Sequence, residues 1–328
     1  MRGCLYGSVS APHFMTPPSL DTWIVKRRPP RNAVDPLRPY LFLAEQERSR
    51  GGAIVPVNTI FLTNRECPWR CLMCDLWKNT LTETLPTGAI PTQIEYALAR
   101  LPVARHIKLY NSGSFFDPRA IPLADYSAIA ALMAPFEHVI VESHPALIGE
   151  NCRRFGDLLG GRLEVAMGLE TVHPSVLPRL NKGMTLDQFG HAAHVLTSRS
   201  IDLRAFILVK PPFLREDEAL TWVARSLEFA FRCEASVASL IPTRAGNGAM
   251  EALALDGDFA PPSIATLEAS LEYGLSLRKG RVFADLWDLR RFSRCGICHD
   301  SRAARLHRMN LDQTIPEPVD CQECGERG

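Results

Sequence analysis

Residues 54–74 read IVPVNTIFLTNRECPWRCLMC, an apolar run that leads directly into three cysteines, Cys67, Cys71 and Cys74. The run at 54–62 is rich in β-branched residues and predicts a buried strand. A cubane [4Fe–4S] cluster contains four irons and is normally held by four thiolates. A short loop with the spacing Cx₃Cx₂C supplies only three thiolates, so it leaves one iron without a protein ligand.

The open iron gives this loop a specific chemistry. It can be chelated by the amino and carboxylate groups of S-adenosylmethionine (SAM), and an electron from the cluster then breaks the sulfonium C–S bond and releases a 5′-deoxyadenosyl radical. The alternatives are three buried thiols or half of a zinc site. Structural zinc takes four ligands, in pairs, and no Cys or His close to the loop completes such a set. The spacing therefore favours the cluster.

A second group of cysteines lies near the C-terminus and forms two Cys-x₂-Cys pairs: Cys295, Cys298, Cys321 and Cys324. Four thiolates in two such pairs predict a metal site, and both zinc and a second iron–sulfur cluster fit this ligand set. Zinc is favoured because residues 302–308 predict a basic helix on a small closed module, which would either contact RNA or cover the core. His299 could replace one cysteine as a ligand.

Composition is that of an ordinary globular protein, with 46% hydrophobic and 22% charged residues among 328. No apolar run approaches the ~20 residues that span a bilayer, and residues 1–8 carry no segment suited to secretion. We therefore expect a cytoplasmic protein without membrane association. In that compartment ten cysteines favour metal ligands over disulfides.

The order of elements predicts an α/β fold. Strands are expected at 54–62, 105–110, 138–142, 163–168, 203–209 and 236–241, and helices at 91–100, 123–134, 150–159, 173–181, 185–199, 216–232 and 262–277. Alternation of this kind predicts a parallel sheet with right-handed crossovers. We expect an extended arm at 1–38, a core domain at 39–280 and the Cys₄ module at 281–328. The arm carries 6 Lys+Arg against 2 Asp+Glu, and residues 278–308 carry 9 against 3, so both segments are candidates for phosphate contact.

Polar residues follow several of the predicted strands. Asn111, Ser112 and Gly113 follow the second strand, Glu142 the third and Glu170 the fourth. The carboxyl ends of parallel strands meet at one edge, where barrel enzymes hold their active sites, so we expect these residues to surround the cysteine loop. Lys182 could pair with the methionine carboxylate of SAM, and Ile241, with Pro242, could pack on its adenine. Arg244 and Asn247 would then face the substrate.

The Cx₃Cx₂C loop after the first predicted strand resembles the radical SAM superfamily. The resemblance implies a partial (β/α)₆ barrel with a [4Fe–4S] cluster and SAM as cofactors. It also implies that the segment at Asn111 and the two strand-end glutamates contact SAM. One departure from the family pattern is Met73, since an aromatic residue often precedes the third cysteine there.

Longer segments resemble one subgroup, the radical subunit of archaeosine synthase and, more remotely, the Elongator catalytic subunit. They are FLTNREC at 61–67, IKLYNSGSFFD at 107–117, GLET at 168–171 and LNK at 180–182. The resemblance implies a lyase-type step in tRNA modification, in which the C–N bond of a lysine adduct on a deazaguanine base is cleaved. It also implies a partner subunit that first attaches the lysine, and a one-electron donor such as ferredoxin or flavodoxin. Arg204, Lys210 and Arg244 are candidate partners of the amino acid tail.

Other functions fit the same residues. A radical SAM enzyme could act on a DNA deazapurine or carry out methylthiolation with an auxiliary cluster. A non-enzymatic protein could bind nucleic acid through its iron–sulfur and zinc sites. These alternatives differ in whether SAM is cleaved and in the number of iron and zinc atoms that each chain holds.

Overall fold

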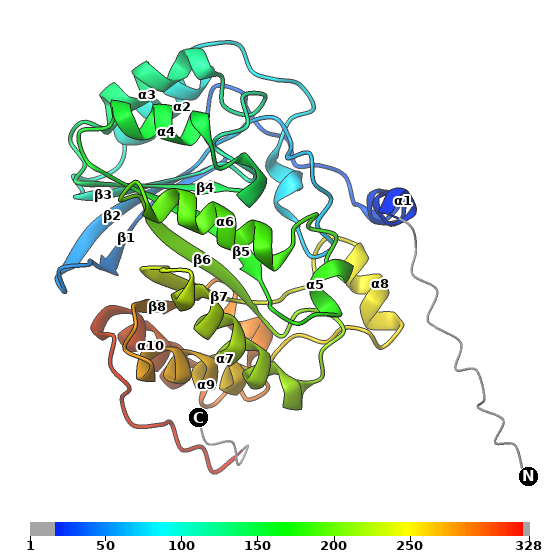
Figure 1. Ribbon diagram of the computed structural model, residues 1–328. Coiled ribbons are helices and arrows are strands. Elements are labelled where there is room, and N and C mark those ends of the chain that lie inside the picture. Colours follow the sequence, from blue (N-terminus) through cyan, green and yellow to red (C-terminus); the bar gives the residue numbers. More distant parts are fainter. Residues whose placement is uncertain (1–16, 324–328) are drawn as a thin grey trace, which may run out of the picture.

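One curled sheet of eight strands, in the order β1 to β8, organises the chain, as the computed structural model shows for residues 17–323 (Figure 1). The strands are β1 (Leu41–Arg48), β2 (Ile54–Phe61), β3 (His106–Tyr110), β4 (His138–Ser143), β5 (Arg162–Glu170), β6 (Asp202–Val209), β7 (Val237–Pro242) and β8 (Arg281–Ala284). Only β1 pairs antiparallel, with β2, and all other neighbours are parallel. The predicted α/β half-barrel is confirmed.

Most of the helices connect the parallel strands and cover one face of the sheet. They are α2 (Ala89–Leu98), α3 (Tyr126–Met133), α4 (Glu150–Leu158), α5 (Val176–Arg179), α6 (Leu186–Thr197), α7 (Glu216–Arg232), α8 (Ala249–Leu255), α9 (Ile264–Ser276) and α10 (His299–Asp312). Local signals define several of their starts. Thr185 and Gln188 form a capping box before α6, and Ser263 caps α9. No helix in the described part of the chain has the length and apolar character needed to cross a membrane.

Strand alternation separates two faces of the sheet. Ile107, Val165 and Ala205 lie in the large apolar core that the helices cover. Their neighbours Lys108 and Glu164 therefore point to the other, inner face. The inner face carries polar and aromatic side chains. The helices pack on the outer face, and a ligand can bind on the inner face.

Buried ion pairs fill the inner face at the N-terminal end of the strands. Arg204 of β6 binds Glu164 of β5 at 2.5 Å and Glu47 of β1 at 2.6 Å. Glu47 also binds Lys108 of β3 at 2.6 Å. On β8, Arg281 donates to the carbonyl oxygen of Arg48 at 2.9 Å. The curl of the sheet thus brings β1 close to β6 and β8. At this end of the strands, charged side chains rather than backbone hydrogen bonds connect β1 to them.

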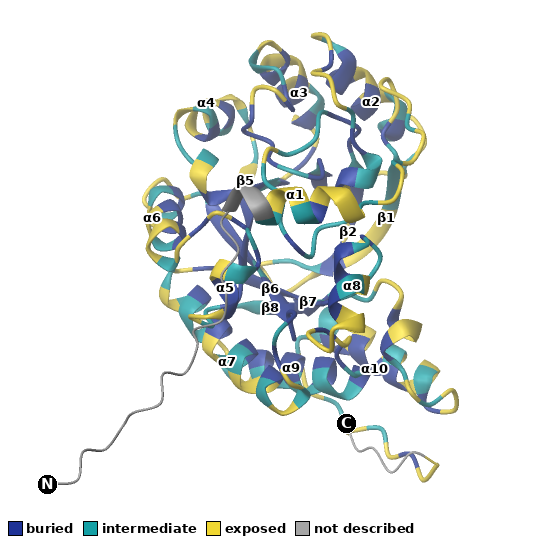
Figure 2. Cartoon of the chain, turned by 90° about the vertical axis from the view of Figure 1, so that its right-hand side faces the viewer, coloured by how far each residue is buried: buried dark blue, intermediate teal, exposed yellow. Residues whose placement is uncertain are grey.

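Part of the expected N-terminal arm is a helix. Residues 17–27 form α1 (Pro17–Arg27), which lies beside the sheet's edge together with α8 (Figure 2). Ile24 of α1 packs with Leu72, next to the cysteine loop, and with Met250 of α8. A Cβ at Gly248 would overlap the carbonyl oxygen of Arg27, so glycine allows this close approach. The extended conformation expected for this segment is therefore wrong for residues 17–27.

The C-terminal segment continues the core beyond residue 280, where we expected a separate module to begin. β8 joins the sheet, and α10 packs on β1, β8 and α9. Arg302 of α10 is fully buried and binds Glu268 of α9 at 2.5 Å, while Arg305 binds Glu272 at 2.6 Å. These two arginines hold α10 on the core, so they are not available to bind RNA.

Candidate active site

The three cysteines lie on the loop after β2, at the C-terminal edge of the sheet. Burial raises the pKa of Cys71 to about 11 and the pKa values of Cys67 and Cys74 to about 12. Thiolates are therefore unfavourable here unless a cation compensates the charge. An iron–sulfur cluster supplies that compensation, so the loop fits the group that its spacing predicts.

Sulfur spacing separates this loop from the C-terminal cysteines. Within residues 17–323, only Cys295, Cys298 and Cys321 have ligand atoms that all lie within 4.8 Å of one another. The Sγ atoms of Cys295 and Cys321 are 3.9 Å apart. A tetrahedral zinc ion with Zn–S bonds of about 2.3 Å holds its sulfurs about 3.8 Å apart. The loop at Cys67 is more open, as a cluster with one thiolate per iron requires.

Distant residues fix the backbone of the cysteine loop. The Nδ2 atom of Asn247, after β7, donates to the carbonyl oxygens of Leu72 and Cys74 at 2.8 and 3.1 Å. A Cβ at Gly113 would lie 3.2 Å from the Cβ of Cys67, so this glycine packs directly on the loop. We expected Asn247 to face the substrate, and instead it supports the cluster loop.

An aromatic stack joins the loop to the end of β4. The rings of Trp69 and His144 are 3.7 Å apart and almost parallel. The Nε2 atom of His144 lies 3.0 Å from the carbonyl oxygen of Lys182. Burial lowers the pKa of His144 to about 4, so the ring is neutral at physiological pH and acts as a rigid spacer.

Arginines of the N-terminal arm also hold the loop. Glu66, next to Cys67, binds Arg28 at 2.7 Å and Arg70 at 3.0 Å, and it also pairs with Arg31. We considered the arm's basic residues for phosphate contact. Arg28 and Arg31 serve a different purpose, because both are bound to this carboxylate.

Glu142, at the end of β4, organises the segment after β3. Its Oε1 atom accepts from the backbone N–H of Asn111 at 2.6 Å and of Gly113 at 3.3 Å. Burial raises the pKa of Glu142 to about 7. The Ser112 hydroxyl lies 2.9 Å from the hydroxyl of Tyr40. The side-chain amide of Asn111 is buried, and neither of its polar atoms has a hydrogen-bond partner within the described residues.

Glu170 and Lys182 form a buried ion pair at 2.8 Å. Burial alone would lower the pKa of Lys182, but the negative charges of the Glu170 carboxylate and of a Cys71 thiolate more than offset it and raise that pKa. The pair lies over Gly168, where a Cβ would be 2.5 Å from the Lys182 Nζ atom and closer still to Glu170 Oε1. Glycine at 168 is therefore needed for the pair to occupy this position.

Among the remaining candidates, Ile241 forms an apolar wall on the inner face of β7, in the cluster that includes Met73 and Leu208. Arg244 lies close to the same edge and binds Asp285 at 2.6 Å. Like Arg244, the other two candidate partners of the amino acid tail are already paired with carboxylates. Arg204 holds the ion pairs at the opposite end, and Lys210 binds Glu216 at 2.6 Å.

The C-terminal cysteines form the second candidate metal centre. Cys298 and Cys321 are buried, and Cys295 is partly exposed. Hydrogen bonds from the backbone N–H groups of Cys298 and Ile297 lower the pKa of Cys295 to about 7, which favours a thiolate ligand. Cys324, the expected fourth ligand, lies outside the described residues.

Sequence reasoning missed several residues of this site. The packing role of Gly168, the His144 ring and Tyr40 were not predicted, and Asn247 was expected to face the substrate rather than to hold the loop. The pattern of strand-end residues did carry a signal for His144, which follows Glu142 by two positions.

Comparisons with known proteins agree with this geometry. No protein-family model matches the chain. It is 25% identical over 288 residues to archaeosine synthase subunit beta of Methanosarcina acetivorans, covering 82% of each protein. It is also 25% identical over 310 residues to an uncharacterized protein of Methanocaldococcus jannaschii, covering 88% of this chain and 82% of that protein. The crystal structure of methylornithine synthase (PylB) superimposes with a TM-score of 0.50 at 16% identity, covering 80% of this chain and 73% of that one.

The two kinds of similarity answer different questions. The likeness to PylB concerns the fold alone and agrees with the predicted partial barrel. The similarity to archaeosine synthase subunit beta confirms the resemblance predicted from the sequence. The chain is therefore similar in sequence to archaeosine synthase subunit beta and in fold to PylB.

Proposed function

We propose that this chain modifies a nucleobase of tRNA by cleaving the C–N bond of a lysine adduct on a deazaguanine base. The observation that carries the chemistry is the three-cysteine loop, which lies beside Glu142 and the Glu170–Lys182 pair at one edge of the sheet. The substrate class is supported by the similarity to archaeosine synthase subunit beta over 82% of both chains.

Cys67, Cys71 and Cys74 would hold the cluster. When bound, the reduced cluster supplies the electron that splits the sulfonium C–S bond of SAM, and the resulting radical can remove hydrogen from an unactivated carbon. The residues around the loop fix the positions of the three cysteines. Asn247 and Gly113 hold the loop, and the Trp69–His144 stack keeps it at the end of β4. Rigid placement matters because a misplacement of about 1 Å can cost about 100-fold in rate.

The residues around the loop divide the contacts to SAM. Glu142 would accept from its ammonium group, and Lys182 would bind its carboxylate. Glu170 would accept from the ribose hydroxyls, and the unpartnered amide of Asn111 offers one further hydrogen bond. Ile241, beside Met73, would pack on the adenine. Ser112 and Gly113 would let the backbone approach the ligand.

SAM affinity is expected to rise between pH 6 and 8. Burial raises the pKa of Glu142 to about 7, so below that pH the carboxyl is protonated and cannot pair with the ammonium group. Above it the carboxylate binds the ammonium, and affinity levels off. Isothermal titration of SAM at several pH values measures the effect, and Glu142→Gln should flatten the profile. An unchanged profile in that variant would assign the pH dependence to another group.

The substrate would lie against the inner face near Arg244. The Nε atom of Arg244 has no partner in the described part of the chain. The guanidinium of Arg244 would bind the carboxylate of a lysine tail. The surrounding protein would exclude water and other hydrogen donors from the reacting C–H.

Two assays test the proposal. Anaerobically reconstituted protein with a reductant should form 5′-deoxyadenosine from SAM, and the absence of cleavage by a reduced cluster would refute the radical mechanism. Mass spectrometry of tRNA nucleosides from a deletion strain should show a lysine-bearing deazaguanosine. Cleavage of SAM without that nucleoside would leave the enzyme class intact and refute the tRNA substrate.

The C-terminal cysteines would hold zinc. Their sulfur separation of 3.9 Å matches a single tetrahedral ion, with Cys324 as the fourth ligand and His299 not required. The triple variant Cys67→Ala/Cys71→Ala/Cys74→Ala should therefore retain one zinc and no iron per chain by plasma mass spectrometry. Iron that persists in this variant would indicate a second cluster instead.

Two partners complete the proposal. The subunit name of the archaeal relative supports a complex with the subunit that attaches lysine to the base. The cluster would receive its electron from a ferredoxin or flavodoxin.

A further inference from the structure

The segment between β8 and α10, residues 286–297, presents side chains outward beside the active site, and we call it the rim segment. It contains the short helix η4 (Leu289–Phe292). Leu289 and Phe292 are buried in the main core. This anchoring leaves Trp287 51% exposed and turns Arg290 to solvent. An exposed tryptophan beside arginines is unusual on a surface without a partner, because its large apolar ring favours burial.

Contacts connect the rim segment to the cluster loop. The N–H of Trp287 donates to the Oδ1 atom of Asp285 at 3.0 Å, and Asp285 binds Arg244 at 2.6 Å. Arg291 donates to the carbonyl oxygen of Ala245 at 3.1 Å. Ala245 lies two residues before Asn247, which holds Cys74. The rim segment is therefore part of the border of the site where the chemistry is proposed.

The charge of the rim segment is positive and largely uncompensated. It carries three arginines, Arg290, Arg291 and Arg294, against one acid, Asp288. Asp288 lies 3.7 Å from Arg291, and both are more than half exposed. No carboxylate within residues 17–323 pairs with Arg290 or Arg294. These two guanidinium groups are free to bind anions.

The candidate metal centre lies directly against the rim segment. A Cβ at Gly296, between Cys295 and Cys298, would lie 3.1 Å from the Arg290 Nη2 atom, so the arginine packs directly on the backbone of the cysteine turn. A metal held by Cys295, Cys298 and Cys321 would make the turn rigid, and Arg290 would be held with it.

Aromatic rings and arginines together are the chemistry that binds single-stranded nucleic acid. Bases stack on the ring, and the guanidinium groups neutralise phosphates. An enzyme that acts on a base must receive that base outside a helical stack, so the neighbouring nucleotides need a surface of their own. We propose that the rim segment binds the unpaired nucleotides next to the target base of tRNA, with Trp287 stacked on one of them and Arg290 and Arg294 on phosphates. This inference rests on the proposed function and specifies how its substrate is held.

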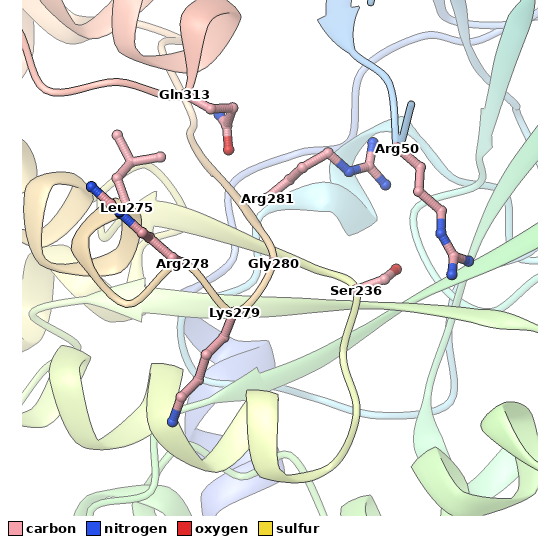
Figure 3. A pocket seen from close by; sticks show the side chains of 8 residues that line it. All are labelled: Arg50, Ser236, Leu275, Arg278, Lys279, Gly280, Arg281 and Gln313. Atoms are coloured by element: carbon pink, nitrogen blue, oxygen red, sulfur yellow. The ribbon is translucent and has the colours of Figure 1, made fainter. Parts of the chain in front are cut away.

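A second cationic surface provides a matched control. A pocket of about 430 Å³ at the opposite end of the strands is lined by Arg50, Arg278, Lys279 and Arg281 (Figure 3). Arg50 binds Asp202 at 3.1 Å, and Arg281 lies 3.5 Å from Glu164. Arg278 and Lys279 are exposed, and they lie far from the cysteine loop along the strands.

Fluorescence anisotropy with a labelled tRNA transcript tests the proposal on the full, metal-loaded chain. Trp287→Ala should weaken binding by about 5- to 100-fold with an unchanged salt dependence, because stacking releases no counterions. Arg294→Glu, alone and with Arg290→Glu, should weaken binding and reduce the salt slope by about one for each phosphate that the variant no longer binds. Arg278→Glu/Lys279→Glu makes the same change of charge and should leave binding unaltered. Zinc content and circular dichroism confirm that each variant is folded.

The outcomes separate the inference from the proposed function. Rim-segment variants that bind tRNA as tightly as the wild-type protein would overturn the inference and leave the proposed function intact. Rim variants that keep tRNA affinity but lose reduction by flavodoxin also overturn it, because they would show a docking site for an acidic protein. If the unmodified chain cleaves SAM but does not bind tRNA, the nucleic-acid substrate and the rim proposal both fail.

Discussion

Replacement of Cys71 by serine is expected to reduce 5′-deoxyadenosine formation to background. The remaining thiolates of Cys67 and Cys74 cannot hold a cubane that already has only three protein ligands. Iron content should fall from about four atoms per chain to nearly none. The serine side chain is slightly smaller than cysteine, and residue 71 lies on a loop rather than in a helix or strand, so the fold itself should survive the change.

The matched control for this variant is Cys233→Ser. Cys233 is partly exposed and follows α7, away from the cysteine loop. The control should retain iron and SAM cleavage at the level of the unmodified chain. Anaerobic iron analysis and a liquid-chromatography assay of 5′-deoxyadenosine measure both quantities. A Cys71→Ser protein that keeps four irons and cleaves SAM would show that another residue can complete the cluster, and the proposed ligand set would be wrong.

Gly168→Ala is expected to lower the rate of SAM cleavage by about 100-fold while the fold stays intact. The new methyl group would lie 2.5 Å from the Lys182 Nζ atom. Both atoms that it meets are the far ends of flexible side chains, so the Glu170–Lys182 pair would move and the backbone would not. A displaced pair can no longer match the carboxylate and ribose of SAM.

Gly160→Ala tests whether that effect is specific. Gly160 is exposed, and a Cβ there would meet nothing within 4 Å. Single-turnover kinetics should show no change in this control, and thermal denaturation should give similar midpoints for both variants. If Gly168→Ala instead unfolds at a much lower temperature with an unchanged rate in the folded fraction, the glycine serves packing and the assignment of the ion pair to SAM loses its support.

The sequence predicts the part of the fold that depends on local pattern. The apolar runs at 105–110, 138–142 and 203–209 match β3, β4 and β6 closely. β1 was missed because its residues Glu45 to Glu47 are polar. Within the sheet, Glu45 binds Lys108 and Glu47 binds Arg204. β8 has only four residues and depends on its pairing with β7.

The residues of the candidate site also fall into those that the sequence pattern predicts and those that depend on distant contacts. Glu142 and Glu170 could be placed at the cysteine loop because strand ends share one edge of a parallel sheet. Arg204 was misjudged as a partner for substrate, since position along the chain does not reveal that Glu47 and Glu164 already bind it. The requirement for glycine at 168 depends on two side chains, and Lys182 belongs to a later segment, so no local pattern contains it.

For the proposed tRNA reaction, the ion pairs between Glu47, Lys108, Glu164 and Arg204 imply an order of binding. They fill the inner face at the N-terminal end of the strands. Ligands must therefore enter and leave at the C-terminal edge. SAM, the smaller ligand, would then have to enter before the tRNA, which blocks the path behind it. Turnover would follow a compulsory order, in which spent 5′-deoxyadenosine and methionine wait for the nucleic acid to depart.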